Sequence, residues 1–188
     1  MTIILNGTTG ITTPALDSVA PFSSADMPAG SVLQVVSTTK TDVTSFVSAN
    51  TNAYVDITGM SVTITPTSAT SKILVMYTAN VSNSTTATVH VRLLRNSTSI
   101  GQGGAEGSRL GDSTVFRPAD TPYNFDMGLL SSSFLDSPNT TSATTYKLAG
   151  TLGSNYNGSF YLNRVSLDSD GSFAGRTASS ITVMEIAG

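Results

Sequence analysis

The sequence contains no cysteine and no tryptophan, and it has few charged residues. Without cysteine, the chain can form neither disulfide bridges nor thiolate metal sites. Only 11% of its 188 residues are charged, compared with about 25% in an average soluble protein. The net charge is -3, and the basic residues never cluster. Because the chain offers no basic patch to a polyanion, we expect no binding of nucleic acid.

Residues that favour helices are also in short supply. Lysine is rare and there are only two glutamates, so few good helix formers are available for exposed helix positions. About three in ten residues are serine or threonine. Short runs of valine, isoleucine, threonine and aromatic residues are interrupted by glycine, asparagine and proline, which is typical of strands and tight turns. The composition therefore predicts an all-β chain, and the length predicts a single core.

Long hydrophobic runs are absent as well. No run approaches the roughly 20 apolar residues that span a membrane. The first residues, Met1 to Gly7, lack the basic and apolar regions of a signal peptide. We therefore expect a protein that is made in the cytoplasm and is not inserted into a membrane.

Two regions differ in their patterning. Within residues 1–29, Pro14, Pro21 and Pro28 interrupt any strand ladder, which predicts an extended N-terminal arm that anchors the protein or helps it to oligomerise. Residues 30–188 contain eight to ten short strands separated by turns. This pattern predicts a β-sandwich head, and a jelly roll is the simplest way to protect its sheet edges.

Three predicted strands are apolar on both faces: residues 31–37, 72–77 and 181–186. In the last of these, Ile181 and Val183 point to one face, whereas Met184 and Ile186 point to the other. The core of one domain covers only one face, so the other face needs a partner. We expect the three strands to share a sheet and another copy of the chain to bury one set of side chains: Val32, Val35, Thr182, Met184 and Ile186.

Five segments of the sequence are similar to segments of a known family: Met27 to Val36, Ile64 to Val75, Leu94 to Asn96, Leu135 to Lys147 and Ile181 to Ile186. Together they resemble the C-terminal head domain of bacteriophage tail-fibre and related virion fibre proteins, from about residue 27 to the end. The resemblance implies a homotrimeric jelly-roll head, similar in kind to those of tumour necrosis factor and complement C1q. Gly10 to Pro14 resembles the stretch that precedes such heads, which implies that residues 1–29 bind another virion protein.

The expected function is that of a non-enzymatic virion structural protein, a short trimeric fibre or tail-fibre head that attaches to the host surface. One alternative is a head fibre that decorates the capsid without binding a receptor. Another is a spike that cleaves polysaccharide with paired carboxylates, for which the only glutamates are Glu106 and Glu185. We expect Glu185 to be buried and paired with arginine or hydroxyl groups, and His90 to face solvent. No catalytic residue is assigned.

Loop residues are the candidates for contact with a host glycan or protein. Tyr123, Asn155 and Tyr156 lie in polar turns where an aromatic ring and an amide suit a sugar. The turn from Asp168 to Gly171 has alternate carboxylates like a calcium loop, but it lacks the remaining ligands of an EF-hand, and an Asx turn is favoured. We expect no metal and no cofactor. A secreted, cytokine-like trimer is disfavoured because there is no signal peptide, cysteine pair or collagen repeat.

Overall fold

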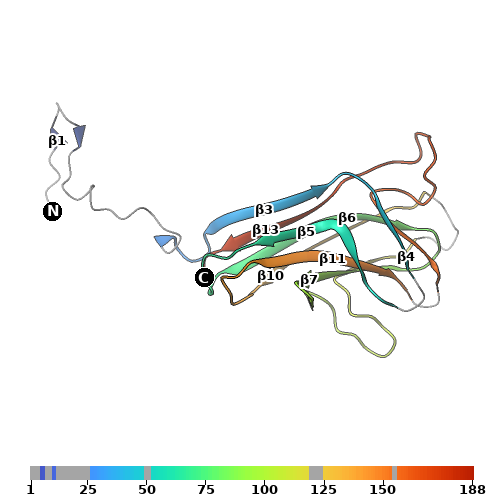
Figure 1. The fold of residues 1–188 in the computed structure, drawn as a ribbon, viewed down its shortest axis with the longest axis horizontal. Coiled ribbons are helices and arrows are strands. Elements are labelled where there is room, and N and C mark those ends of the chain that lie inside the picture. Colours follow the sequence, from blue (N-terminus) through green and yellow to red (C-terminus); the bar gives the residue numbers. More distant parts are fainter. Residues whose placement is uncertain (1–4, 7–9, 12–25, 49–51, 119–124, 154–155) are drawn as a thin grey trace.

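The computed structural model describes residues 5–6, 10–11, 26–48, 52–118, 125–153 and 156–188. Within these ranges the chain forms thirteen strands and no α-helix, which confirms the all-β prediction (Figure 1). None of the described residues belongs to a helix that is long and apolar enough to cross a membrane.

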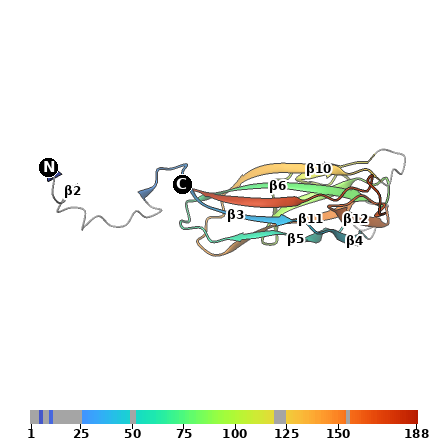
Figure 2. The same cartoon turned by 90° about the horizontal axis from the view of Figure 1, so that it is seen from above.

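The first sheet contains six strands, and β6 lies at its centre. It runs in the order β3-β13-β6-β12-β4, and β10 also pairs with β6. Figure 2 shows β10, β6 and β3 in one layer, with the red strand β13 between β6 and β3. The strands of this sheet are β3 (Val32–Lys40), β4 (Thr44–Ser48), β6 (Lys72–Asn83), β10 (Gly128–Asp136), β12 (Gly158–Leu162) and β13 (Ser179–Ile186).

The second sheet runs in the order β5-β11-β7-β8, and β9 also pairs with β7. Its strands are β5 (Val55–Ile64), β7 (Val89–Arg95), β8 (Thr98–Ile100), β9 (Thr114–Phe116) and β11 (Thr144–Leu152). The order β3-β13-β6-β10 facing β5-β11-β7-β9 is that of a jelly roll, in which the chain crosses repeatedly between two antiparallel sheets. The predicted jelly-roll sandwich is confirmed.

Little of the predicted N-terminal arm falls within the described residues. Strand β1 (Leu5–Asn6) pairs with β2 (Gly10–Ile11) in an antiparallel arrangement. Residues 1–4, 7–9 and 12–25 lie outside the described part of the chain. The role of residues 1–29 as an arm therefore stays a prediction.

The core fills the space between the two sheets. Strand alternation explains it, since every second side chain of β6 points inward, from Ile73 through Val75 and Tyr77 to Val81. The inward side chains of the opposite sheet include Met60, Tyr146 and other large residues that are fully buried. Phe160 of β12 stacks on Phe46 of β4, with ring centroids 4.6 Å apart, and extends the core beyond the eight jelly-roll strands.

The three strands that were predicted to be apolar on both faces are neighbours in the first sheet. Strand β13 lies between β3 and β6 and pairs with both. Its buried and half-buried residues alternate strictly, so Ile181 and Val183 reach the core while Met184 and Ile186 point outward. The prediction that these strands share a sheet is confirmed.

One local turn signal in the sequence does not join two paired strands. Asn157-Gly158 is a strong hairpin signal, which predicts that the strand beginning at Phe160 pairs with β11. Instead, β12 pairs with β4 and β6, so the chain crosses between the sheets here. A local turn signal does not specify the sheet that the next strand joins.

A buried charge network connects the two sheets. Asp136, the last residue of β10, accepts two hydrogen bonds from Nη1 of Arg95 in β7, at 2.8 and 3.0 Å. It also accepts one from the hydroxyl of Tyr146 in β11, at 2.7 Å. Burial, together with this bond to a carboxylate, raises the pKa of Tyr146 well above its usual value. The network ties the first sheet to two strands of the second.

The chain enters and leaves the sandwich at the same end. The backbone N–H of Gly30 donates to the carbonyl of Ala187, and the N–H of Ala187 donates to the carbonyl of Ser31, both at 2.8 Å. Figure 1 shows the C-terminus beside the start of β3. We refer to this end of the sandwich, with Gly30 and Ala187, as the terminal pole.

Candidate functional site

The outward face of β3, β13, β6 and β10 is a candidate interaction surface. Strand register aligns Val35 with Met184, Met184 with Leu74, and Leu74 with Leu135. Four apolar side chains thus form one continuous row across four strands, because side chains at paired positions lie on the same side of a sheet. Val35 is 53% exposed and Leu135 is 49% exposed in the single chain.

Further rows extend this surface on both sides. Ile186 is aligned with Val32 and with Lys72, and Thr182 lies between Ser37 and Met76. A β-bulge between Glu185 and Ile186 keeps Val32 and Val35 on the same face. We refer to the surface as the assembly face, and its members are Val32, Val35, Leu74, Met76, Leu135, Thr182, Met184 and Ile186.

The five residues predicted to contact another copy of the chain all lie on the assembly face. Val32 and Val35 are exposed, whereas Thr182, Met184 and Ile186 are half-buried by their own neighbours. Lys72 is the only charged side chain aligned with these rows, and the surrounding outward residues are mainly serine and threonine. An apolar face with so little charge suits burial against a protein partner.

The carboxylate of Glu185 is held behind the assembly face. The residue is fully buried, and its Oε2 accepts a hydrogen bond from Nε2 of Gln34 at 2.6 Å. Its Oε1 accepts two hydrogen bonds from Thr67, from the backbone N–H and the hydroxyl, each at 2.8 Å. Burial was predicted correctly, but the partners are an amide, a hydroxyl and a backbone group, and no arginine of the described residues contacts the carboxylate.

These contacts make the stability of the fold sensitive to acid. Burial alone would raise the pKa of Glu185, but the hydrogen bonds from Gln34 and Thr67 outweigh it and lower the pKa below 4.5. Since the folded state binds this proton less readily than the unfolded state, the contribution of Glu185 is complete above pH 4.5 and is lost as the pH falls through the folded pKa.

We expect Glu185→Gln to flatten the pH dependence of unfolding. Urea denaturation between about pH 3 and 7 measures it, at one fixed protein concentration. Glu106→Gln is the matched control, because Glu106 is 85% exposed and contacts only Arg109 among the described residues, at 3.6 Å. An acid profile of Glu185→Gln that equals the wild-type profile would contradict the assignment.

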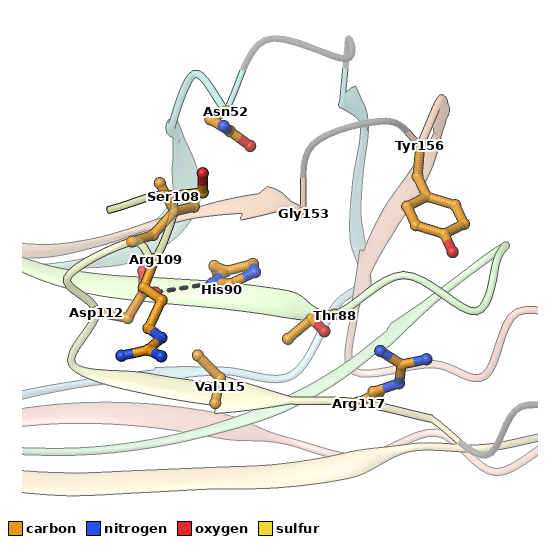
Figure 3. Close-up of a pocket in the computed structure, with 11 residues that line it drawn as sticks. Asn52, Thr88, His90, Ser108, Arg109, Asp112, Val115, Arg117, Gly153 and Tyr156 are labelled. Carbon is orange, nitrogen blue, oxygen red and sulfur yellow. Dashed lines mark hydrogen bonds and ion pairs between the residues drawn. The ribbon is translucent and has the colours of Figure 1, made fainter. Parts of the chain in front are cut away.

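A second candidate site is a pocket of about 380 Å³ against the outward face of the second sheet. Figure 3 shows His90 near its centre, with Asp112 and Arg109 on one side and Arg117 and Tyr156 on the other. We refer to it as the His90 pocket. Tyr156 is 41% exposed and comes from the segment between β11 and β12.

His90 is held in place by a loop that returns over the sheet. Its Nδ1 lies 2.7 Å from Oδ2 of Asp112, and the side chains of His90 and Asp112 are only 15% and 6% exposed. The loop between β8 and β9 carries Asp112 and is fixed by a bond of 3.0 Å from the N–H of Gly103 to the carbonyl of Asp112. His90 points outward from its strand, but this loop covers it, so the prediction that His90 faces solvent was wrong.

Asp112 is also bound on the side away from His90. The hydroxyl of Tyr54 donates to Oδ1, and burial, together with this bond, raises the pKa of Tyr54 well above its usual value. The guanidinium of Arg92 lies over the ring of Tyr54, 3.8 Å from its centroid, and donates from Nε to the carbonyl of Gly111 at 2.8 Å. No hydroxyl in the described part of the chain hydrogen-bonds the other ring nitrogen of His90, so we assign no nucleophile here.

The remaining predicted positions are not part of one site. Tyr123 and Asn155 lie outside the described residues. Asp168 pairs with two arginines, through Nη1 of Arg164 at 2.9 Å and Nη2 of Arg176 at 2.5 Å. Its charge is therefore balanced by side chains. Within the described ranges, no group of three or more histidine or acidic side chains has an arrangement suited to a metal ion.

Sequence reasoning missed the pairing of His90 with Asp112 and the cations beside it. The two residues are 22 positions apart, and their contact depends on the path of a glycine-rich loop. The one signal in the sequence was the cluster of glycines in this loop. In the structure, Gly111 approaches Gly103 so closely that a Cβ on Gly111 would lie 2.5 Å from the Gly103 carbonyl oxygen. Glycine clusters within a loop are typical of such close backbone approaches.

Comparison with known proteins assigns no family. No protein-family model matches the sequence, and no curated protein matches it. Among solved structures, a chain in the structure of infectious bursal disease virus Gx strain is similar, with 14% sequence identity and a TM-score of 0.38. The similarity covers 82% of this chain and 37% of the viral chain, so this protein spans well under half of that chain's length.

Proposed function

We propose that the protein is a homotrimeric structural protein on the surface of a bacteriophage virion, a short fibre or tail-fibre head that takes part in host attachment. The observation that carries this proposal is the apolar row from Val35 through Met184 and Leu74 to Leu135. The row crosses four strands of the first sheet, and the side chains at its two ends, Val35 and Leu135, are 53% and 49% exposed in the described part of the chain.

A second copy of the chain is the partner that we propose for this face. Fully burying an exposed apolar side chain of this size contributes about 1.5–3 kcal/mol. Each copy supplies seven apolar side chains on the assembly face, and the gain is largest for the three that are exposed in the single chain: Val32, Val35 and Leu135. Identical copies that meet through one surface repel each other when that surface carries many charges of one sign. The assembly face has only Lys72 aligned with it, so copies of the chain can approach each other closely.

The sequence resemblance to phage fibre heads supports a trimer and a virion location. The jelly roll adds to this support, because its strand order places β3, β13, β6 and β10 side by side in one sheet, whose outward face could line a threefold axis. In this proposal, residues 1–29 bind another virion protein, and the end of the sandwich opposite the terminal pole faces outward. Capsid decoration without a receptor would use the same trimer and would need no ligand site.

The proposal includes no catalytic role. Glu185 is enclosed and hydrogen-bonded inside the sandwich, while Glu106 is exposed on the loop between β8 and β9. These two glutamates therefore do not form the paired carboxylates that flank a glycosidic bond in glycosidases. Release of reducing sugar from host polysaccharide by the purified protein would contradict this part of the proposal.

The test of the proposal is the mass of the protein in solution. Size-exclusion chromatography with light scattering should give about 58 kDa, three times the chain mass of 19.4 kDa. Cryo-electron microscopy of the intact particle should then show threefold density for the head at its surface. A single species with the mass of one chain at micromolar concentration would overturn the trimer.

A further inference from the structure

The His90 pocket brings basic and hydrogen-bonding groups together on the outward face of the second sheet. Two of the six arginines, Arg109 and Arg117, and the only histidine line it, although the chain as a whole has a net charge of -3. The one acidic lining residue, Asp112, is already bound by His90 and Tyr54. Both arginines are exposed, and Arg109 also pairs with Glu106 at 3.6 Å, so the acidic group of a ligand can approach them beside this pair.

Neutral polar groups complete the lining. Thr88, Ser108 and Asn52 contribute hydroxyl and amide groups, and the only large aliphatic side chains are Leu110 and Val115. Oδ1 of Asn52 is buried and has no hydrogen-bond partner among the described residues.

The geometry around His90 leaves room for a ligand atom. Asp112 binds Nδ1, so Nε2 lies on the opposite side of the ring, toward Gly153. A Cβ on residue 153 would lie 3.3 Å from Nε2, and only glycine leaves this space open. The N–H of Gly153 donates to the carbonyl of Thr88 at 2.9 Å, which fixes the backbone at that distance.

We propose that the His90 pocket binds an acidic saccharide, that is, a sugar that carries a carboxylate or a phosphate. Arg109 and Arg117 bind the acidic group, since a guanidinium pairs with two oxygens of a carboxylate or phosphate. Nε2 of His90 accepts a hydrogen bond from a sugar hydroxyl, because the bond to Asp112 places the ring proton on Nδ1. The exposed ring of Tyr156 packs against the apolar face of the sugar.

The position of the pocket suits contact with a surface outside the particle. Strand β11 begins opposite Ile64, near the terminal pole, and ends at Leu152, next to the pocket. Its nine residues separate the pocket from the terminal pole by roughly 30 Å. This inference rests on the proposed function, in which the terminal pole faces the particle, and it names the ligand class of the attachment site.

Binding of small saccharides to the full-length protein tests the inference. The probes are a hexuronate disaccharide, a hexose phosphate and a neutral disaccharide of the same size, each followed by saturation-transfer NMR and titration calorimetry. We expect binding of the hexuronate, the hexose phosphate or both, and no binding of the neutral sugar. Equal binding of all three probes, or of none, would overturn the inference, and the two acidic probes distinguish carboxylate from phosphate.

Three variants locate the site. Arg109→Gln should weaken binding about fivefold to tenfold, as expected for an exposed charged hydrogen bond. Gly153→Ala should also weaken it by placing a methyl group against Nε2 of His90. Arg176→Gln, an exposed arginine outside the pocket, is the control and should bind as the wild type does. Unchanged affinity in both pocket variants would contradict the assignment.

The same samples separate this inference from the proposed function. If light scattering gives a trimer and no acidic saccharide binds, the ligand assignment fails while the trimeric virion protein stands. If the protein is a monomer that still binds an acidic saccharide at the His90 pocket, the trimer fails while the site stands.

Discussion

Val35→Glu should convert the trimer into monomers. Val35 lies at the β3 end of the apolar row, beside Met184, and is 53% exposed in the single chain, so the isolated sandwich tolerates the new side chain. In the trimer, each of the three copies would bury one glutamate carboxylate without a partner. Burying an unpaired charge costs several kcal/mol. Light scattering should show a fall from about 58 kDa to the mass of one chain, 19.4 kDa.

Val115→Glu is a closely matched control. Val115 is also 53% exposed, but it lies in β9 on the outward face of the second sheet. The two variants have the same chemistry and the same exposure, and they differ in the sheet that carries them. A trimer in both variants would exclude the assembly face, and monomers in both would show that any surface glutamate has this effect.

Asp136→Ala should cause the largest loss of stability within the sandwich. The substitution leaves Arg95 and the hydroxyl of the buried Tyr146 without their shared partner. Removing one partner of a buried ion pair costs about 3–5 kcal/mol. Urea unfolding at a fixed protein concentration measures the change, since the apparent stability of an oligomer depends on concentration.

Two further variants show how much of this loss of stability comes from the charge of Asp136 and how it compares with the loss of an exposed ion pair. Asp136→Asn keeps an oxygen acceptor for Tyr146 but removes the charge, so its loss should be smaller than that of Asp136→Ala. Asp56→Ala removes an exposed pair with Lys147, in which Asp56 is 59% exposed, and it should cost less than about 1 kcal/mol. If Asp136→Ala were no more destabilising than Asp56→Ala, the network would not connect the sheets energetically.

Alternation along the strands was the most informative part of the sequence. It predicted that β3, β6 and β13 have two apolar faces, and these strands are neighbours in one sheet. It worked because side chains alternate between faces whatever the strand pairs with. Strands β4, β8 and β9 were not predicted, because they have five residues or fewer and contain too few alternating positions to stand out.

The pocket was less predictable than the fold. Tyr156 was predicted as an exposed contact residue, and it lines the His90 pocket. Its partners come from four separate parts of the sequence, around residues 52, 90, 110 and 153. They meet because a glycine-rich loop folds back over β7 and because the chain changes sheets after β11. Neither event leaves a periodic signal in the sequence.

The bonds between Gly30 and Ala187 have a practical consequence for experiments with this protein. Because both backbone connections of the sandwich leave from the terminal pole, a fluorescent label or affinity tag joined before Gly30 or after Ala187 would be placed there. The end that carries the His90 pocket would remain unobstructed in either fusion. Immobilisation through a tag at either position should therefore leave every copy oriented for ligand capture.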